Sequence, residues 1–451
     1  MFDTDKRLAS VRPSRRQLEF QKTEFYAFVH FTVNTFTDRE WGDGTESPEV
    51  FAPLRLDAEQ WCRAIADAGM RGLILTCKHH DGFCLWPSRY TSHSVALSPC
   101  KKDVVKEVSA ACRKYGLKFG VYLSPWDRHE PTYGTGKAYD DYFVSQLTEL
   151  LTGYGDIFCV WFDGACGEGA GGKKQYYDWE RYYSVIRKLQ PDACINVCGP
   201  DIRWCGNEAG QTRPAEWSVL PKDMKDTEKV ASLSQQSDDA AFRARRLSAS
   251  DLDLGSREKL KNEKELIWYP AEVNTSIRPG WFWHKSEDDR VRSPEELFDI
   301  YLKSVGGNAT FLLNIPPTDE GLFHENDVRC LKKLGELVRG VYGESVTAAS
   351  VITPERIELT LAPGSRAEYL ILQEDIRKGQ LVESFTVLAD GKPVYEGTVI
   401  GYKRIVRLGG ITPEKITVLI TAARDEPDIL TAEVYTVPQL RCQPQPGAAA
   451  K

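Results

Sequence analysis

Two carboxylates in the chain lie in settings that suit nucleophilic or acid–base chemistry. Asp163 follows a short apolar run and precedes a glycine, which keeps the approach to its carboxylate open. Glu208 lies in the glycine-flanked segment 206–210, beside Trp204. An apolar neighbour raises the pKa of a carboxyl group, as a general acid requires. Each residue also has a purely structural reading, Asp163 as the cap of a following helix and Glu208 as an exposed loop charge.

Three of the seven histidines lie in two short motifs. His79 and His80 are adjacent at the end of the apolar run 72–77, and His30 lies in the aromatic run 26–31. Neutral imidazole both donates and accepts hydrogen bonds, which suits the vicinal hydroxyls of a sugar. The alternatives are a metal site and, for His30, a satisfied core histidine. Adjacent side chains on a regular strand point to opposite faces, so chelation of one ion by both His79 and His80 would need an irregular backbone.

These groups together match the needs of a retaining glycosidase. Such an enzyme uses two carboxylates about 5 Å apart, one as nucleophile and one as acid/base. Polar side chains bind the hydroxyls, and aromatic ones cover the apolar faces of the sugar. Two other hypotheses stay open. One is a metal-dependent barrel hydrolase that uses the three histidines. The other is an inactive glycan-binding protein, against which the presence of both carboxylates argues.

Short apolar runs alternate with amphipathic helical segments over most of the chain. The runs are 26–31, 72–77, 119–123, 157–162, 194–197 and 311–315. Asp57 and Asp103 are predicted to cap helices that end at Gly69 and Gly116, and 139–151 is a third helix. This alternation is typical of a parallel α/β barrel or an open doubly wound sheet, and no GxGxxG or Walker motif favours the latter. We predict a TIM-like (β/α) barrel over residues 12–340, with the polar residues at the carboxyl ends of its strands.

The pattern changes after about residue 345. Predicted strands at 346–361, 368–373, 385–394 and 416–420, with a turn at 389–392, indicate an all-β sandwich domain over residues 345–437. We expect this domain to pack on the barrel rather than to bind glycan. The tail 438–451 is rich in Pro, Gly and Ala and is expected to be disordered. The charged insertion 221–262 is expected at the surface, as a solvated helix pair or as a substrate lid.

Composition excludes several classes of protein. The net charge is −7 and there is no basic stripe, so nucleic acid is not an expected partner. No apolar stretch is long enough for a membrane span. The twelve cysteines show neither CxxC nor zinc-type spacing, which fits a reducing compartment. With no apolar leader at the N-terminus, a cytoplasmic location is expected, and a trimmed secreted protein is the alternative.

Several short motifs together resemble one known family. Residues 28–31, 79–83, 161–164 and 306–317 are similar to segments of the α-L-fucosidases of glycoside hydrolase family 29, and the resemblance extends over residues 12–435. Segments 34–36, 40–44, 206–210 and 276–281 resemble the subfamily that prefers branched α-1,3/1,4-linked fucose. The resemblance implies a distorted barrel followed by a β-sandwich, a fucosylated oligosaccharide as substrate, and no metal or other cofactor.

The resemblance also implies roles for individual residues. It implies a retaining exo-hydrolase of Lewis-type oligosaccharides with Asp163 as nucleophile and Glu208 as acid/base, for which Glu216 and Glu272 are rivals. The implied substrate-binding residues are His30, Glu40, Trp41, His79, His80, Tyr122 and Trp281. The fucose methyl group needs an apolar wall, for which the candidates are Phe31, Phe83, Trp281 and Trp283.

Overall fold

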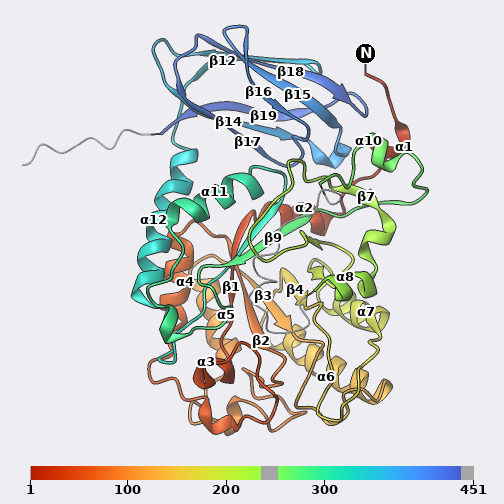
Figure 1. Ribbon diagram of the computed structural model, residues 1–451, viewed down its shortest axis with the longest axis vertical. Helices are drawn as coiled ribbons and strands as arrows, with labels where there is room; N and C mark the ends of the chain where they lie inside the picture. The colour runs from red at the N-terminus through yellow and green to blue at the C-terminus, as the bar shows by residue number, and fades with distance from the viewer. Residues whose placement is uncertain (1, 235–251, 438–451) are drawn as a thin grey trace, which may run out of the picture.

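The computed structural model describes residues 2–234 and 252–437. Figure 1 shows a barrel, coloured red to green, beneath a layer of blue antiparallel strands formed by the C-terminal part of the chain. Helices α4, α5, α11 and α12 lie on one side of the barrel in this view, and α6, α7 and α8 lie on the other. No helix within the described ranges is both long and apolar enough to cross a bilayer.

The barrel is a single parallel sheet with the strand order β5-β4-β3-β2-β1-β10-β9-β6. The strands are β1 (Phe25–Val29), β2 (Gly72–Lys78), β3 (Lys118–Leu123), β4 (Cys159–Phe162), β5 (Cys194–Val197), β6 (Arg203–Trp204), β9 (Ala271–Ser276) and β10 (Thr310–Asn314). An isolated parallel bridge joins Asn196 of β5 to Ile202, next to β6, and nearly closes the ring. The predicted TIM-like barrel is therefore confirmed.

Two of the barrel strands were not predicted. β6 has only two residues, and β9 reads Ala-Glu-Val-Asn-Thr-Ser, which is not an apolar run. β9 is nevertheless fully buried, because Glu272 and Asn274 find hydrogen-bond partners inside the barrel. A buried polar side chain is tolerated when it is hydrogen-bonded, and this is why a hydrophobicity pattern misses such a strand.

The predicted helix starts are confirmed by their caps. The carboxylate of Asp57 accepts the N–H of Gln60 at 2.9 Å, and that of Asp103 accepts the N–H of Lys106 at 2.9 Å. The main helices are α4 (Ala58–Asp67), α5 (Val104–Lys114), α6 (Lys137–Gly153), α7 (Trp179–Leu189), α11 (Pro294–Ser304) and α12 (Glu325–Val341). The shorter helices are α1 (Lys6–Ala9), α2 (Arg15–Gln21), α3 (Val33–Thr37), α8 (Thr227–Leu233) and α10 (Arg257–Leu260).

The C-terminal region forms two antiparallel sheets that share one apolar core and make a sandwich. One sheet has the order β11-β19-β14-β17 and the other β12-β13-β18-β15-β16. The strands are β11 (Glu344–Ser345), β12 (Thr347–Ile352), β13 (Arg356–Leu361), β14 (Ala367–Glu374), β15 (Val382–Ala389), β16 (Lys392–Gly397), β17 (Arg404–Ile411), β18 (Lys415–Ala423) and β19 (Ile429–Thr436).

Two predicted strands in this region are in fact hairpins. Residues 346–361 turn back between β12 and β13, and 385–394 turn back at Asp390 and Gly391, which both have positive φ. The predicted turn at 389–392 is confirmed, and it divides the predicted strand 385–394 between β15 and β16. Strands β17 and β19 were not predicted. The tail 438–451 lies outside the described residues.

The charged insertion leaves and re-enters the barrel through a two-stranded ribbon. The ribbon pairs β7 (Val219–Pro221) with β8 (Leu266–Trp268). Val230 of α8 packs against the barrel core, and a Cβ on Gly164 would lie only 2.0 Å from Ser234 Oγ. This part of the insertion is therefore packed beside Asp163. Residues 235–251, on which the lid and helix-pair predictions also depend, lie outside the described part of the chain.

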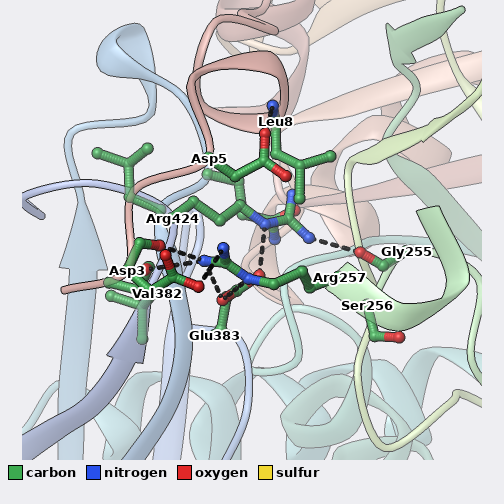
Figure 2. Close-up of polar contacts among 12 residues, drawn as sticks. Asp3, Asp5, Leu8, Gly255, Ser256, Arg257, Val382, Glu383 and Arg424 are labelled. Atoms are coloured by element: carbon green, nitrogen blue, oxygen red, sulfur yellow. Dashed lines mark hydrogen bonds and ion pairs between the residues drawn. The ribbon is translucent and has the colours of Figure 1, made fainter. Parts of the chain in front are cut away.

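The segment by which the insertion returns to the barrel is joined to the C-terminal sheets by a cluster of charged side chains, of which Arg424 is fully buried (Figure 2). The guanidinium of Arg424 is fully buried, donates to Glu383 Oε1 at 3.1 Å and to the carbonyl of Gly255, and lies 4.6 Å from the Trp217 ring. Arg257 donates to the other Glu383 oxygen at 2.9 Å. The cluster therefore joins three segments that are far apart in the sequence.

Loss of Arg424 is expected to destabilise the protein strongly. Arg424→Ala removes one of the two guanidinium partners of Glu383 and the donor to the Gly255 carbonyl, and it leaves a cavity against Trp217. The lost packing and hydrogen bonds should lower the free energy of unfolding by about 3 kcal/mol. Urea titration followed by tryptophan fluorescence measures this change. Arg407→Ala is the matched control, because its ion pair with Asp299 spans 3.7 Å at the surface and is worth about 1 kcal/mol at most. Equal losses in the two variants would contradict the stabilising role of the cluster.

Candidate active site

A pocket of about 450 Å³ opens at the carboxyl ends of the barrel strands. Its lining residues are Phe28, His30, Glu40, Trp41, His79, His80, Trp161, Asp163, Ala165, Glu208, Asn274 and Trp281. The structure thus brings together all but one of the site residues predicted from the sequence. The exception, Tyr122, is buried on β3, and its hydroxyl donates to Asp163 Oδ2 at 3.1 Å.

Asp163 is held at the end of β4. Its Oδ1 accepts the N–H of Ala165 at 2.8 Å, and His80 Nε2 lies 3.8 Å from its Oδ2. Burial raises the pKa of Asp163, while the N–H groups of Ala165 and Gly164 and the hydroxyl of Tyr122 oppose the rise by stabilising the anion. Asp163 caps no helix, because α7 begins later and is capped by Asp178. Its carboxylate is instead presented to the pocket.

Glu208 enters the pocket from the loop after β6. The indole N–H of Trp281 donates to Glu208 Oε2 at 3.1 Å. Gly206 and Gly210 have φ of 105° and 77°, so both take the left-handed conformations that favour glycine. The amide oxygen of Asn207 accepts two backbone N–H groups and braces the loop. Glu208 is therefore a positioned carboxylate rather than a free surface charge.

The two rival carboxylates lie outside the pocket. Glu216 is buried; burial would raise its pKa, but ion pairs with Arg203 and Arg213 outweigh this and lower the pKa. Glu272 is buried in the barrel and accepts hydrogen bonds from three side chains, and burial raises its pKa. Its donors are Tyr26 Oη at 2.5 Å, Asn196 Nδ2 at 2.7 Å and Trp161 Nε1 at 2.8 Å. Neither residue lines the pocket that contains Asp163 and Glu208.

The three predicted histidines form one cluster in the pocket. The ring centroids of His79 and His80 are 4.1 Å apart, and those of His30 and His79 are 5.5 Å apart. Burial lowers the pKa of His30 to about 4, that of His80 to about 3, and that of His79 well below its usual range. The imidazoles are therefore neutral at neutral pH and can each donate and accept.

The backbone explains how adjacent histidines enter the same pocket. β2 ends at Lys78, after a register shift between Thr76 and Lys78, so His79 and His80 do not lie on a regular strand. In residues 2–234 and 252–437 no group of three or more His, Cys, Asp or Glu side chains is arranged to hold a metal ion.

The apolar wall of the pocket differs from the expected one. Of the four predicted aromatic residues only Trp281 lines it. Phe31 and Phe83 are buried in the barrel core, and the indole N–H of Trp283 donates to Asp288 at 2.9 Å beside another cavity. Phe28 and Trp161, with centroids 5.1 Å apart, line the pocket in their place. Both lie near the ends of predicted strands, which is the signal that could have found them.

Asn314, which the sequence analysis did not single out, organises this wall. Its Oδ1 accepts from His30 Nδ1 at 2.8 Å, and its Nδ2 donates to the carbonyl of Trp281 at 2.8 Å and to Ser276 Oγ at 2.9 Å. Because His30 Nδ1 donates here, its Nε2 is left as an acceptor. Asn314 is the last residue of β10, so the rule that active sites form at the carboxyl ends of barrel strands points to it.

Comparison with known proteins decides the family. Residues 14–344 match the family model described as α-L-fucosidase. α-L-Fucosidase 1 of Arabidopsis thaliana is 36% identical over 470 residues, which cover 94% of this chain and 87% of that protein. The chain belongs to the α-L-fucosidase family. It is a glycoside hydrolase of fucosylated glycans, and its fold matches its relatives along nearly the whole length.

Solved structures agree with this assignment. A glycoside hydrolase 29 family member from an unknown rumen bacterium has a TM-score of 0.82 and 37% identity, covering 96% of this fucosidase and 78% of that chain. A Ruminococcus gnavus GH29 fucosidase in complex with fucose has a TM-score of 0.79 and 25% identity, and the match covers 97% of each chain.

The fucosidase should bind fucosides poorly when Asn314 is replaced. Asn314→Leu leaves the His30 N–H and the Trp281 carbonyl without their partner and frees both side chains to move. We expect KM for 4-nitrophenyl fucoside to rise about tenfold, which corresponds to about 1.4 kcal/mol of binding.

Asn308→Leu is the matched control for this change. Asn308 is also fully buried, but its bonds to the Glu216 carbonyl and the Tyr402 N–H lie at the junction with the C-terminal sheets. This variant should lower the melting temperature and leave KM unchanged. A comparable rise of KM in both variants would show that Asn314 acts only through stability.

Proposed function

We propose that this fucosidase is a retaining exo-enzyme that releases α-1,3/1,4-linked L-fucose from branched, Lewis-type oligosaccharides by double displacement. The observation that carries the mechanism is the pairing of Asp163 with Glu208 in one small pocket. Asp163 is fixed at a strand end, which suits a nucleophile that must be placed accurately. Glu208 lies on a braced loop, from which an acid can reach the leaving group.

In the first step Asp163 attacks the anomeric carbon. A bond forms between a carboxylate oxygen and that carbon as the bond to the glycosidic oxygen breaks, and the proton of Glu208 passes to the departing oxygen. Tyr122 and the N–H of Ala165 hold the two carboxylate oxygens of Asp163 in place before attack. The neutral histidines supply donors and acceptors for the hydroxyls of fucose.

In the second step water replaces the enzyme at the anomeric carbon. Glu208, now ionised, takes a proton from the attacking water, and the bond from Asp163 to the sugar breaks. Two inversions leave the released fucose with the anomeric configuration of the substrate.

The loops around the pocket support the linkage preference. Three of the segments that resemble the α-1,3/1,4 subfamily meet in one network: Glu40 accepts the N–H of Trp281, and the Trp281 indole donates to Glu208. A second, wider cavity of about 1180 Å³ adjoins the first at Asp163. Tyr176 lines it with 86% of its surface exposed, and such a ring offers a stacking platform for the other sugars of a branched glycan.

The two carboxylate variants should differ in their substrate dependence. Asp163→Ala should abolish turnover of every fucoside. Glu208→Ala should lower kcat on natural glycans by about 10²–10⁴-fold, spare 4-nitrophenyl fucoside more, and recover with azide, which attacks the intermediate without base catalysis. Asp178→Ala is the control from the same β4–α7 connection. It removes the cap of α7 and should cost about 1 kcal/mol of stability without loss of turnover.

Proton NMR at early reaction times tests the stereochemistry. Initial release of the inverted anomer would remove the double-displacement mechanism. Unchanged activity of Glu208→Ala would remove Glu208 from the acid/base role.

The linkage proposal is tested by competition between substrates. We expect kcat/KM for Lewis trisaccharides to exceed that for α-1,2-fucosylated glycans, and Tyr176→Ala to raise KM for the trisaccharides about tenfold while KM for 4-nitrophenyl fucoside stays constant. Tyr90→Ala, at another exposed tyrosine, is the control. Faster cleavage of α-1,2-linked fucose than of Lewis trisaccharides would overturn the linkage assignment.

A further inference from the structure

The carboxylate of Glu40 holds the segment 280–284 against the pocket. Its Oε2 accepts the N–H of Trp281 at 2.9 Å, and its Oε1 accepts the N–H of Phe282 at 3.0 Å. A Cβ on Gly280 would lie 2.5 Å from Oε1, so the backbone approaches this carboxylate more closely than any residue but glycine allows. The position of Trp281 therefore depends on where Glu40 is held.

His284 contacts the carboxylate of Glu40 but does not line the pocket. Its Nε2 lies 2.8 Å from Glu40 Oε1 and its Nδ1 lies 2.7 Å from Asp38 Oδ1. Asp38 ends α3 in the left-handed conformation, with φ of 57°. Because both imidazole nitrogens face carboxylate oxygens, both must donate, and His284 carries a positive charge between Asp38 and Glu40.

We propose that His284 is a positioning residue for the fucosidase reaction, which fixes Glu40 and through it the contact between the Trp281 indole and Glu208. The path is continuous: His284 to Glu40, Glu40 to the backbone of Trp281, and the Trp281 indole to Glu208 Oε2 at 3.1 Å. His284 itself does not line the pocket. The inference rests on the proposed acid/base role of Glu208.

The charge of His284 agrees with this geometry. The hydrogen bond to Glu40 raises the pKa of His284 to about 9. Partial burial opposes this rise, and Asp38 and the nearby Glu287 add to it. Below that pH the imidazolium persists in the folded protein, and as the pH rises through about 9 its charge is lost. An effect of His284 on the reaction should therefore be constant near neutral pH and fade in alkaline solution.

Substitutions of His284 test the proposal through the leaving-group dependence of kcat. His284→Phe removes both donors and should lower kcat on a Lewis trisaccharide about tenfold, but on 4-nitrophenyl fucoside less than about twofold, because that leaving group needs little protonation. His284→Gln keeps one donor toward Glu40 and should recover part of the loss. The ratio of wild-type kcat to that of His284→Gln should approach one as the pH rises past about 9.

His324→Gln is the matched control. His324 is also half-buried and lies 3.5 Å from a carboxylate, that of Asp288, but it belongs to the start of α12. This variant should lower stability without changing the substrate dependence of kcat.

A double-mutant cycle distinguishes the role proposed for His284 from the role proposed for Glu208. In a Glu208→Ala background His284→Phe should have no further effect on kcat for the trisaccharide. If Glu208→Ala is impaired as proposed but His284→Phe lowers kcat by the same factor in both backgrounds, His284 does not act through Glu208. Equal losses on both substrates in the single variant would also overturn the inference. If Glu208→Ala is fully active, the acid/base assignment itself fails.

Discussion

The carboxylate of Glu272 lies inside the barrel beneath the pocket, and the strands that carry the active site are tied to it. It is fully buried on β9 and accepts hydrogen bonds from side chains on β1, β4 and β5. Apolar packing alone allows strands to slide, whereas three directional bonds to one carboxylate fix how far apart their carboxyl ends lie. One donor, Trp161, lies two residues before Asp163 and forms a wall of the pocket. The placement of Asp163 is thus linked to a buried carboxyl group that does not line the pocket.

Above this carboxylate the pocket is built mainly from residues that orient one another. Asn314 fixes the tautomer of His30 and binds the backbone carbonyl of Trp281. The hydroxyl of Ser124 lies 2.7 Å from His80 Nδ1. Glu40 accepts the backbone N–H of Trp281. His30, His80 and Glu40 therefore each have a hydrogen-bond partner in the protein before a sugar binds. Such preorganisation means that little conformational freedom is lost when a sugar binds.

The sequence predicted the parts of this site that are local in the chain. A carboxylate or a histidine pair directly after an apolar run can be found because the strand and its polar end are neighbours in sequence. The bond between His30 and Asn314 spans 284 positions and that between Glu40 and the Trp281 N–H spans 241, and no local pattern encodes such a pairing. The same limit explains why β9 was missed. Its buried Glu272 and Asn274 look like surface residues until their partners across the barrel are known.

The cluster formed by Arg424, Arg257 and Glu383 joins the insertion of the barrel to the C-terminal sheets. Gly255 and Arg257, which this cluster holds, belong to the same insertion as α8. α8 packs beside Gly164, next to the nucleophile. A fragment cut after α12 would keep every residue of the pocket yet lose the anchor of the chain that covers one side of it. Without the C-terminal sheets, Gly255 and Arg257 would lose Arg424 and Glu383, their partners at this junction. Trimming or grafting the enzyme has to preserve that junction as carefully as the pocket.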